Sequence, residues 1–265
     1  MTVNGTVPSR VGILGDVHGS LRVMEQAFIA ARKVGVDTII QLGDFWIYDN
    51  PREVAKLVRR ARVFGVSSVL FLDGNHEAYS FFGGKHSVPG FHSIAGGDGI
   101  LHLLGRGSII AFDGTQVKAL VLGGAVSTDR FLTGTDRAGR RIKPRVEGKD
   151  WFPEEAITAE QAEYAASVAG DCTVLLSHDA PNAVVAAHDL TRGSDIHPVS
   201  AADDAASRAN LDIAWNALSS PKFSVHGHFD TDAHSVTAQG DSLHSLSDGS
   251  LLVFDAVDLK VTKAK

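Results

Sequence analysis

The chain has 265 residues, of which 44% are hydrophobic and 21% are charged, close to the average of soluble globular proteins. That composition excludes a disordered chain, a collagen-like repeat and a coiled coil. The 25 Lys and Arg residues against 31 Asp and Glu give a net charge of −6. This acidic balance argues against a stable nucleic-acid partner, because phosphate-backbone binding needs a basic surface.

No segment has the pattern of a membrane anchor, a leader or a linker between domains. No apolar run reaches the roughly 18 to 20 residues of a membrane span, and residues 1–8 lack the basic and apolar parts of a secretory signal. The chain has no internal repeat and no linker that marks a domain boundary. We therefore expect a single domain over residues 1–265, in a cytoplasmic protein without a membrane partner.

The first third of the chain alternates short apolar runs with amphipathic segments. Residues 11–14, 38–42 and 69–72 predict strands, and the segments between them predict helices that end at Gly35 and Gly65. This β-α-β-α-β pattern implies parallel strands joined by right-handed crossovers. In such sheets, ligands bind beyond the carboxyl ends of the strands.

The rest of the chain predicts further strands, two helices, two hairpin turns and two long loops. The helices are a capping-box helix from Thr158 to Gly170 and a second one over 200–218. Single strands are predicted at 173–176 and 223–225, and a hairpin is predicted from 108–112 and 116–122 around Asp113-Gly114. The tail predicts two or three antiparallel strands, with a second hairpin turn at Asp248-Gly249. Residues 80–99 and 127–150 predict the two long loops.

Side chains that can bind metal follow five of the apolar runs. Taken singly, each is more often an ordinary turn or core residue, but five such strand ends in one chain are hard to assign to chance. The set combines oxygen and imidazole donors without thiolate, which suits Mn²⁺, iron or Zn²⁺. Two metal ions about 3.5–4 Å apart can generate hydroxide from water and neutralise both ends of a phosphoryl displacement. The residues concerned are Asp16, His18, Asp44, Asn75, His76, His178 and His228.

These residues lie in five short blocks, which are GDVHG at 15–19, GD at 43–44, GNHE at 74–77, SH at 177–178 and GH at 227–228. In this order the blocks resemble those of the calcineurin-like metallophosphoesterase superfamily, across residues 15–230. The resemblance implies an α/β fold, a four-layer α/β/β/α sandwich with two mixed β-sheets flanked by helices. It also implies a dinuclear metal centre between the two sheets.

The resemblance further implies a role for each matching residue. The cofactors would be two divalent metal ions, with manganese as the first expectation and iron, zinc, nickel or cobalt as alternatives. Asp44 would bridge the two ions and so take part in catalysis. His76 would be the catalytic histidine beside the phosphoryl group, and Asn75 would contact the substrate as well as a metal. The ligands of the first ion would be Asp16 and His18, and those of the second Asn75, His178 and His228.

The last block departs from the family pattern, which commonly reads GHxH. Here the sequence is GHFD, with Asp230 at the position of the final histidine. We expect Asp230 to complete the first metal site through a carboxylate oxygen, and a shifted frame that uses His226 is the alternative. Arg130, in the polar loop, is a candidate for substrate binding because its planar guanidinium suits a phosphate.

The predicted function is a metal-dependent phosphoesterase that uses a metal-bound hydroxide to cleave a phosphate monoester. Its substrate would be a phosphorylated small molecule, a nucleotide or a phosphoprotein. The second block reads GDFWIYD and lacks the phosphate-binding arginine of the phosphoprotein phosphatases, which weakens that last class. The alternatives are a phosphodiesterase on cyclic nucleotides or nucleic acid and a metal-binding scaffold that does not catalyse.

Overall fold

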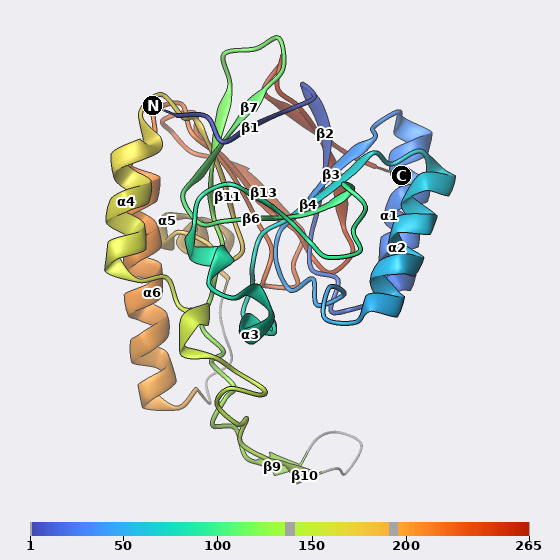
Figure 1. The fold of residues 1–265 in the computed structure, drawn as a ribbon. Coiled ribbons are helices and arrows are strands. Elements are labelled where there is room, and N and C mark those ends of the chain that lie inside the picture. The colour runs from blue at the N-terminus through green and yellow to red at the C-terminus, as the bar shows by residue number, and fades with distance from the viewer. Residues whose placement is uncertain (1, 136–140, 191–195, 265) are drawn as a thin grey trace.

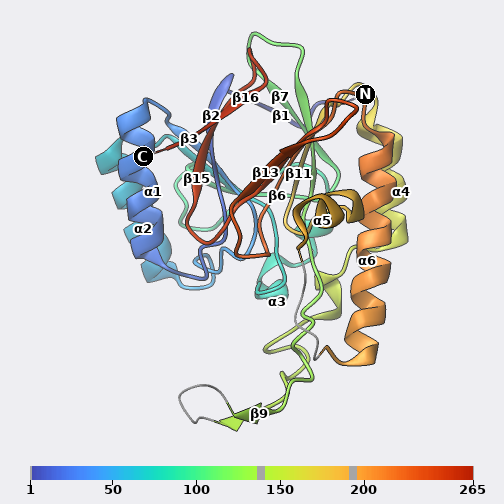
Figure 2. The same ribbon diagram turned by 180° about the vertical axis from the view of Figure 1, so that it is seen from behind.

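Two seven-stranded β-sheets pack face to face between two pairs of helices (Figure 1). The computed structural model describes residues 2–135, 141–190 and 196–264. Helices α1 (Leu21–Val34) and α2 (Pro51–Phe64) cover one sheet, and α4 (Ala159–Ala169) and α6 (Pro198–Ala217) cover the other, as the view from behind also shows (Figure 2). The predicted four-layer α/β/β/α sandwich is confirmed.

The first sheet contains the strands predicted in the first third of the chain. Strands β2, β3, β4 and β6 pair in parallel, while β15 pairs antiparallel with β2 and β5 pairs antiparallel with β6. The order across the sheet is β16 (Lys260–Lys263), β15 (Leu251–Asp255), β2 (Arg10–Leu14), β3 (Thr38–Gln41), β4 (Ser68–Phe71), β6 (Leu101–Leu104) and β5 (Phe91–Ser93).

The second sheet is also mixed. Strands β8, β11, β12 and β14 pair in parallel, and β7 and β13 pair antiparallel with β8 and β14. The hairpin predicted around Asp113-Gly114 joins β7 to β8. The order across the sheet is β1 (Gly5–Val7), β7 (Ser108–Phe112), β8 (Lys118–Leu122), β11 (Val174–Ser177), β12 (Phe223–His226), β14 (Ser242–Ser245) and β13 (Ala233–Val236).

The main helices begin and end where the sequence places their caps. Asn50 caps α2 through a side-chain oxygen that accepts from the backbone N–H of Arg52, and Thr158 and Gln161 form the capping box of α4. Gly35 and Gly65 end α1 and α2 in the left-handed conformation. The shorter helices are α3 (Tyr79–Phe82), α5 (Asn182–His188) and the 3₁₀ turns η1 (Lys85–Ser87) and η2 (Pro153–Glu155). No helix among the described residues is long and apolar enough to cross a membrane.

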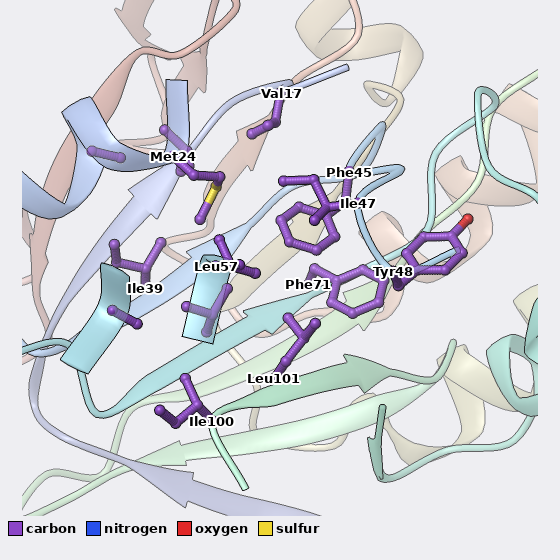
Figure 3. Close-up of a cluster of buried hydrophobic side chains, with 14 of the residues drawn as sticks. Val17, Met24, Ile39, Phe45, Ile47, Tyr48, Leu57, Phe71, Ile100 and Leu101 are labelled. Atoms are coloured by element: carbon purple, nitrogen blue, oxygen red, sulfur yellow. The ribbon is translucent and has the colours of Figure 1, made fainter. Parts of the chain in front are cut away.

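Three buried apolar clusters fill the spaces between the four layers. Neighbouring residues of one strand face opposite ways, so that Ile13 lies in the cluster between the sheets and Leu14 in the cluster under α1 and α2. Figure 3 shows part of the latter cluster, which includes Val17 and Phe45. Because these residues directly follow Asp16 and Asp44, the core fixes the two loops that carry those carboxylates.

Two loop predictions need correction. Asp248-Gly249 is not a hairpin turn, because the strands it joins, β14 and β15, belong to different sheets. Residues 80–99 are not one long loop, since most of α3, the turn η1 and the edge strand β5 lie within them. In both places the local sequence is compatible with more than one structure, and the pairing of the strands in the folded protein decides which one forms.

The polar segment after β8 forms an arm that projects from the body of the molecule (Figures 1 and 2). We define the arm as residues 128–135 and 141–150. It carries a two-stranded ribbon of β9 (Gly134–Thr135) and β10 (Arg141–Ile142). The loop prediction over 127–150 otherwise holds for the described residues, and residues 136–140 of it lie outside them.

Candidate metal centre

Four of the five predicted polar strand ends meet in one cavity, which we call the central cavity, and the fifth, which carries His178 after β11, is not part of its lining. The loops that follow β2, β3 and β4 in the first sheet and β12 in the second contribute to its wall, because both sheets end at the same side of the sandwich. Its volume is about 230 Å³. The lining residues are Asp16, His18, Asp44, Asn75, His76, Val126, Thr128, Asp129, His228, Asp230 and Asp248.

Asp44 lies at the centre of the donor atoms. Its carboxylate oxygens are 3.4 Å from Nε2 of His178 and 3.8 Å from Nδ1 of His18. The Oδ2 atom of Asp16 lies 4.0 Å from Nε2 of His18. One donor atom each from Asp16, His18 and Asp44 falls within 4.8 Å of the other two, so these three residues could hold one metal ion together.

His178 is oriented as a metal-binding histidine commonly is. Its ring is fully buried, and Nδ1 lies 2.7 Å from the carbonyl oxygen of Leu42, to which it donates. The proton on Nδ1 leaves Nε2 as the acceptor, and Nε2 faces Oδ1 of Asn75 at 3.2 Å. A backbone carbonyl that holds the second nitrogen of a metal ligand fixes its tautomer and direction.

The charges in the cavity favour bound cations. Burial and the neighbouring carboxylates of Asp44, Asp248 and Asp230 raise the pKa of Asp16 well above its usual value. Burial also opposes ionisation of Asp44, but the imidazoles of His178, His76 and His18 lower the pKa of that carboxyl. Carboxylates held this close need a compensating positive charge, which a divalent ion with oxygen and nitrogen ligands provides.

The backbone adopts unfavourable conformations to bring these donors together. His18, Asp44, Trp46, His228 and Asp230 all have a positive φ, between 47° and 70°, a region that non-glycine residues rarely adopt. A Cβ on Gly74 would lie 2.2 Å from Oδ1 of Asp44, and one on Gly227 would lie 2.2 Å from Oδ1 of Asp16. The two blocks therefore need glycine for close approach to the carboxylates.

Asn75 is held by a chain of hydrogen bonds that the sequence does not reveal. Its Nδ2 donates to Oγ of Ser127 at 3.2 Å, and Ser127 donates from both N and Oγ to the buried carboxylate of Glu155 at 2.6 and 3.0 Å. With its amide nitrogen engaged, Asn75 directs Oδ1 toward His178. Ser127 and Glu155 thus act as positioning residues for a candidate ligand.

His76 forms part of the cavity wall without joining the carboxylate cluster. Its backbone N–H donates to Oδ1 of Asp44 at 2.8 Å, and its ring meets that of His18 edge-on with centroids 5.3 Å apart. Burial lowers the pKa of His76; Asp44 opposes this shift, while Arg145 and His18 add to it. The ring is thus placed to contact a group bound over the donor cluster.

The two candidates in the last block occupy different places. Asp230 lines the central cavity, whereas His226 is fully buried, with Nδ1 2.9 Å from the carbonyl oxygen of Gly227 and its ring edge-on to Phe229.

The cavity wall also includes Asp248, whose Oδ2 lies 3.7 Å from Nε2 of His18. Its Asp-Gly pair predicted only a turn, so the sequence alone misses this carboxylate.

The structure places a different arginine from the predicted one against His76. Arg130 is buried, its guanidinium lies over the rings of Phe131 and Trp151, and it forms an ion pair with Asp203. It does not line the central cavity. Arg145, from the base of the arm, instead has its guanidinium nitrogens 3.3 and 3.4 Å from the ring nitrogens of His76.

A two-sheet sandwich with carboxylate and imidazole donors at its strand ends is the architecture of metallophosphoesterases. The family model of the calcineurin-like phosphoesterases matches residues 9–229, so the chain belongs to that family. No curated protein matches the chain.

Solved structures share the fold at low sequence identity. The protein TT1561 of Thermus thermophilus is 14% identical, with a TM-score of 0.51 over 99% of this chain and 98% of that one. A dimetal phosphatase from Danio rerio is also 14% identical, with a TM-score of 0.50 over 93% of each chain. A further crystal structure reaches 0.55 at 10% identity over 97% of this chain and 98% of the other. These similarities concern the fold alone.

Proposed function

We propose that the protein is a metal-dependent phosphatase that hydrolyses phosphate monoesters at the central cavity. The observation that carries this proposal is the convergence of four strand ends with metal-binding side chains on one cavity that has His76 in its wall, with His178 of a fifth strand end against Asp44 and Asn75. The Danio rerio neighbour, a dimetal phosphatase, has the same fold.

The donor set fits two divalent ions. Asp16, His18 and Asp230 would hold one ion, and Asn75, His178 and His228 the other, with Asp44 shared between them. Manganese suits this mixture of oxygen and imidazole donors, and iron, zinc, nickel and cobalt are the alternatives to test. When bound, such a pair activates water as a nucleophile and neutralises the phosphoryl oxygens.

The remaining chemistry falls to side chains around the ions. His76 faces the cavity beside Asp44 and is placed to donate a proton to the leaving oxygen, a contribution typically of about 10²–10⁴ in rate. Ser127 and Glu155 keep the Asn75 amide directed at the cavity. Arg145 adds a fixed guanidinium beside His76, which favours the dianionic monoester over the monoanionic diester.

A turnover screen tests the proposal. The protein is stripped with a chelator, reloaded with Mn²⁺, Fe²⁺, Zn²⁺, Ni²⁺ or Co²⁺ in turn, and assayed on p-nitrophenyl phosphate and bis-p-nitrophenyl phosphate. We expect kcat/KM for the monoester to exceed that for the diester at least ten-fold. The reverse preference would establish a phosphodiesterase, and two bound ions without turnover of either ester would indicate a non-catalytic scaffold.

A further inference from the structure

A second cavity adjoins the central one and shares His76 with it. We call it the arm-side cavity, because Arg145, Lys149 and Asp150 at the base of the arm form one of its walls. Its volume is about 210 Å³. The lining residues are Trp46, His76, Glu77, Ala78, Arg145, Lys149 and Asp150.

The shared residue His76 indicates which part of a substrate would lie in the arm-side cavity. A phosphoryl group in the central cavity has His76 at its side, and the oxygen that His76 protonates is the one that joins the phosphorus to the leaving group. The leaving group therefore continues past His76, away from the carboxylates. The arm-side cavity, which shares His76 with the central cavity, offers a space for this group.

The walls of this space are held in place by the protein itself. The guanidinium of Arg145 is fixed by Oδ2 of Asp129 at 2.6 Å and by the backbone carbonyl of Asp150 at 3.4 Å. The carboxyl of Glu77 accepts from the backbone N–H groups of Phe45 and Trp46 and from the Tyr48 hydroxyl. Arg145 and Glu77 thus enter the wall already partnered.

Lys149 differs from its neighbours in the wall. Its backbone N–H donates to the carbonyl of Val146 at 3.2 Å, which fixes the turn that carries it. Within residues 2–135, 141–190 and 196–264, no hydrogen bond or ion pair engages its ammonium group. The side-chain oxygen of Asp150, the nearest acidic residue in sequence, accepts from the Val146 N–H at 3.2 Å. Lys149 is therefore the cation in this wall that is open to an anionic ligand.

Trp46 adds an apolar surface to the wall of the arm-side cavity. Its side chain is 48% exposed although it is a large aromatic, and its indole N–H donates to Asp49 at 3.1 Å. A ring held this way presents a flat face against which a small carbon skeleton packs. The cavity thus offers one apolar face, one free ammonium and one fixed guanidinium, beside the carboxyl groups of Glu77 and Asp150, which both accept hydrogen bonds from the protein.

We propose that the arm-side cavity binds the leaving group of the substrate, and that this group is a small alcohol with a second negative charge, a carboxylate or a further phosphate, paired with Lys149. The inference rests on the proposed phosphatase function. It narrows the substrate to a small phosphorylated acid or bisphosphate.

The test compares esters that differ in the charge of the alcohol. Glycerol 3-phosphate and 3-phosphoglycerate have similar size, but only the second leaves an alcohol with a carboxylate, and glycerol 1,3-bisphosphate, which leaves an alcohol with a phosphate and no carboxylate, supplies the phosphate alternative. We expect kcat/KM for 3-phosphoglycerate to exceed that for glycerol 3-phosphate about five-fold, as one partly exposed ion pair allows. A higher value for the bisphosphate than for 3-phosphoglycerate would identify phosphate as the preferred second group.

Two lysine variants on the arm test whether Lys149 causes the preference for a charged leaving alcohol. Lys149→Gln should bring the ratio of the two specificity constants close to one. Lys143→Gln is the matched control, because Lys143 is an exposed lysine of the same arm that lines neither cavity, and it should keep the wild-type ratio. A ratio that Lys149→Gln does not change, or a wild-type preference for glycerol 3-phosphate, would overturn the inference.

Failure of this inference is distinguishable from failure of the proposed function. Turnover of p-nitrophenyl phosphate without charge preference among the glycerol esters refutes only the leaving-group site. The dissociation constants of 3-phosphoglycerate and glycerol 3-phosphate are also measured by calorimetry on wild type and Lys149→Gln. The charge preference is then decided even where no ester turns over.

Discussion

The guanidinium of Arg145 spans the imidazole of His76, with Nη1 3.3 Å from Nδ1 and Nη2 3.4 Å from Nε2. The two ring nitrogens point in different directions, so a guanidinium that reaches both lies across the ring rather than donating along one lone pair. Asp129 holds the far side of the guanidinium at 2.6 Å. The arm therefore restricts the ring that forms the wall between the two cavities.

The first prediction concerns His76. His76→Ala should lower kcat by about 10²–10⁴, the usual contribution of a general acid, because His76 is the imidazole that lines both cavities. The metal content, measured by mass spectrometry, should stay at the wild-type level. His102→Ala, a change at a half-buried histidine of β6, is the control and should alter neither quantity. A loss of metal from His76→Ala would place His76 among the ligands.

Asp44→Asn should reduce turnover more than any other single substitution. The amide keeps the size of the carboxylate and one oxygen for the His76 N–H, but it loses the charge and the second oxygen that a shared ligand needs. We expect less than a tenth of wild-type kcat at saturating metal, since metal catalysis supplies several kcal/mol. Asp98→Asn, at an exposed carboxylate paired with Arg62, should have no effect. Activity above a tenth would rule out a shared Asp44 ligand.

The last sequence block gives a prediction about metal affinity. Asp230→Ala should weaken the binding of one metal ion and leave the binding of the other unchanged. A calorimetric titration should then resolve two affinities that differ more than in wild type. His226→Asn should leave both affinities unchanged, because the His226 ring is buried away from the central cavity. Asp230→His should then shift the weakened site toward Zn²⁺, which imidazole favours. Loss of an ion from His226→Asn alone would support the shifted frame instead.

The sequence predicts the framework of the site because each of its blocks follows an apolar run. Runs such as 11–14 and 38–42 must be buried strands, and the residues after parallel strands meet at one edge of a sheet. Asp16, Asp44 and Asn75 therefore converge for reasons that are visible in the sequence. The caps of α1, α2 and α4 are equally local, and they lie where the side chains predict.

The positions of Asp248 and Arg145 depend on contacts that no local sequence pattern encodes. Asp248 follows β14 in an Asp-Gly pair that fits a hairpin, and only the separation of β14 and β15 into different sheets brings it to His18. Arg145 and Arg130 lie in one polar segment without periodicity. Which of them reaches the site depends on Phe131 and Trp151, whose rings pack against Arg130 and hold it away from the cavity.

Acid should destabilise the fold through His244. The ring is buried beside three other imidazoles, those of His234 on β13, His188 on α5 and His226 on β12, and burial together with these neighbours lowers the pKa of His244 to about 3. Because the pKa of His244 is lower in the folded protein, the unfolded chain binds a proton at this histidine at a higher pH than the folded protein does. The stabilising contribution is therefore present above about pH 6.5 and is lost progressively as the pH falls toward 3.

The measurement for His244 is urea unfolding of the metal-free protein at pH 7.5 and pH 5. His244 should account for about 2 kcal/mol of the loss in the free energy of unfolding between these pH values. His244→Phe, which keeps a ring against Phe223, should lose correspondingly less, whereas His102→Phe should behave as wild type. An equal acid-induced loss in His244→Phe would show that His244 accepts its proton in the folded state without penalty.

The final prediction concerns the buried ion pair that supports the GNHE block. The guanidinium of Arg106 is 1% exposed and donates to Oδ2 of Asp73 at 2.6 and 3.0 Å. It also donates to the backbone carbonyls of Glu155 and Ala156 at 3.0 and 2.8 Å. Burial raises the pKa of Asp73, but Arg106, His86 and Tyr79 together lower it below its usual value, so that the carboxylate stays ionised. One side chain thus joins the end of β4 to the turn η2.

Arg106→Met should therefore lower the free energy of unfolding by about 3–5 kcal/mol, the usual cost of leaving one partner of a buried pair without its counter-charge. Arg106→Lys should fall between wild type and Arg106→Met, because an ammonium keeps the charge but cannot reach Asp73 and the carbonyls together. Adding Asp73→Asn to Arg106→Met should restore part of the loss, since the amide removes the unpaired charge. A cost below about 1 kcal/mol for Arg106→Met, or a double variant that simply sums the two single losses, would show that Asp73 and Arg106 act independently and that the block before Asn75 is held by its backbone alone.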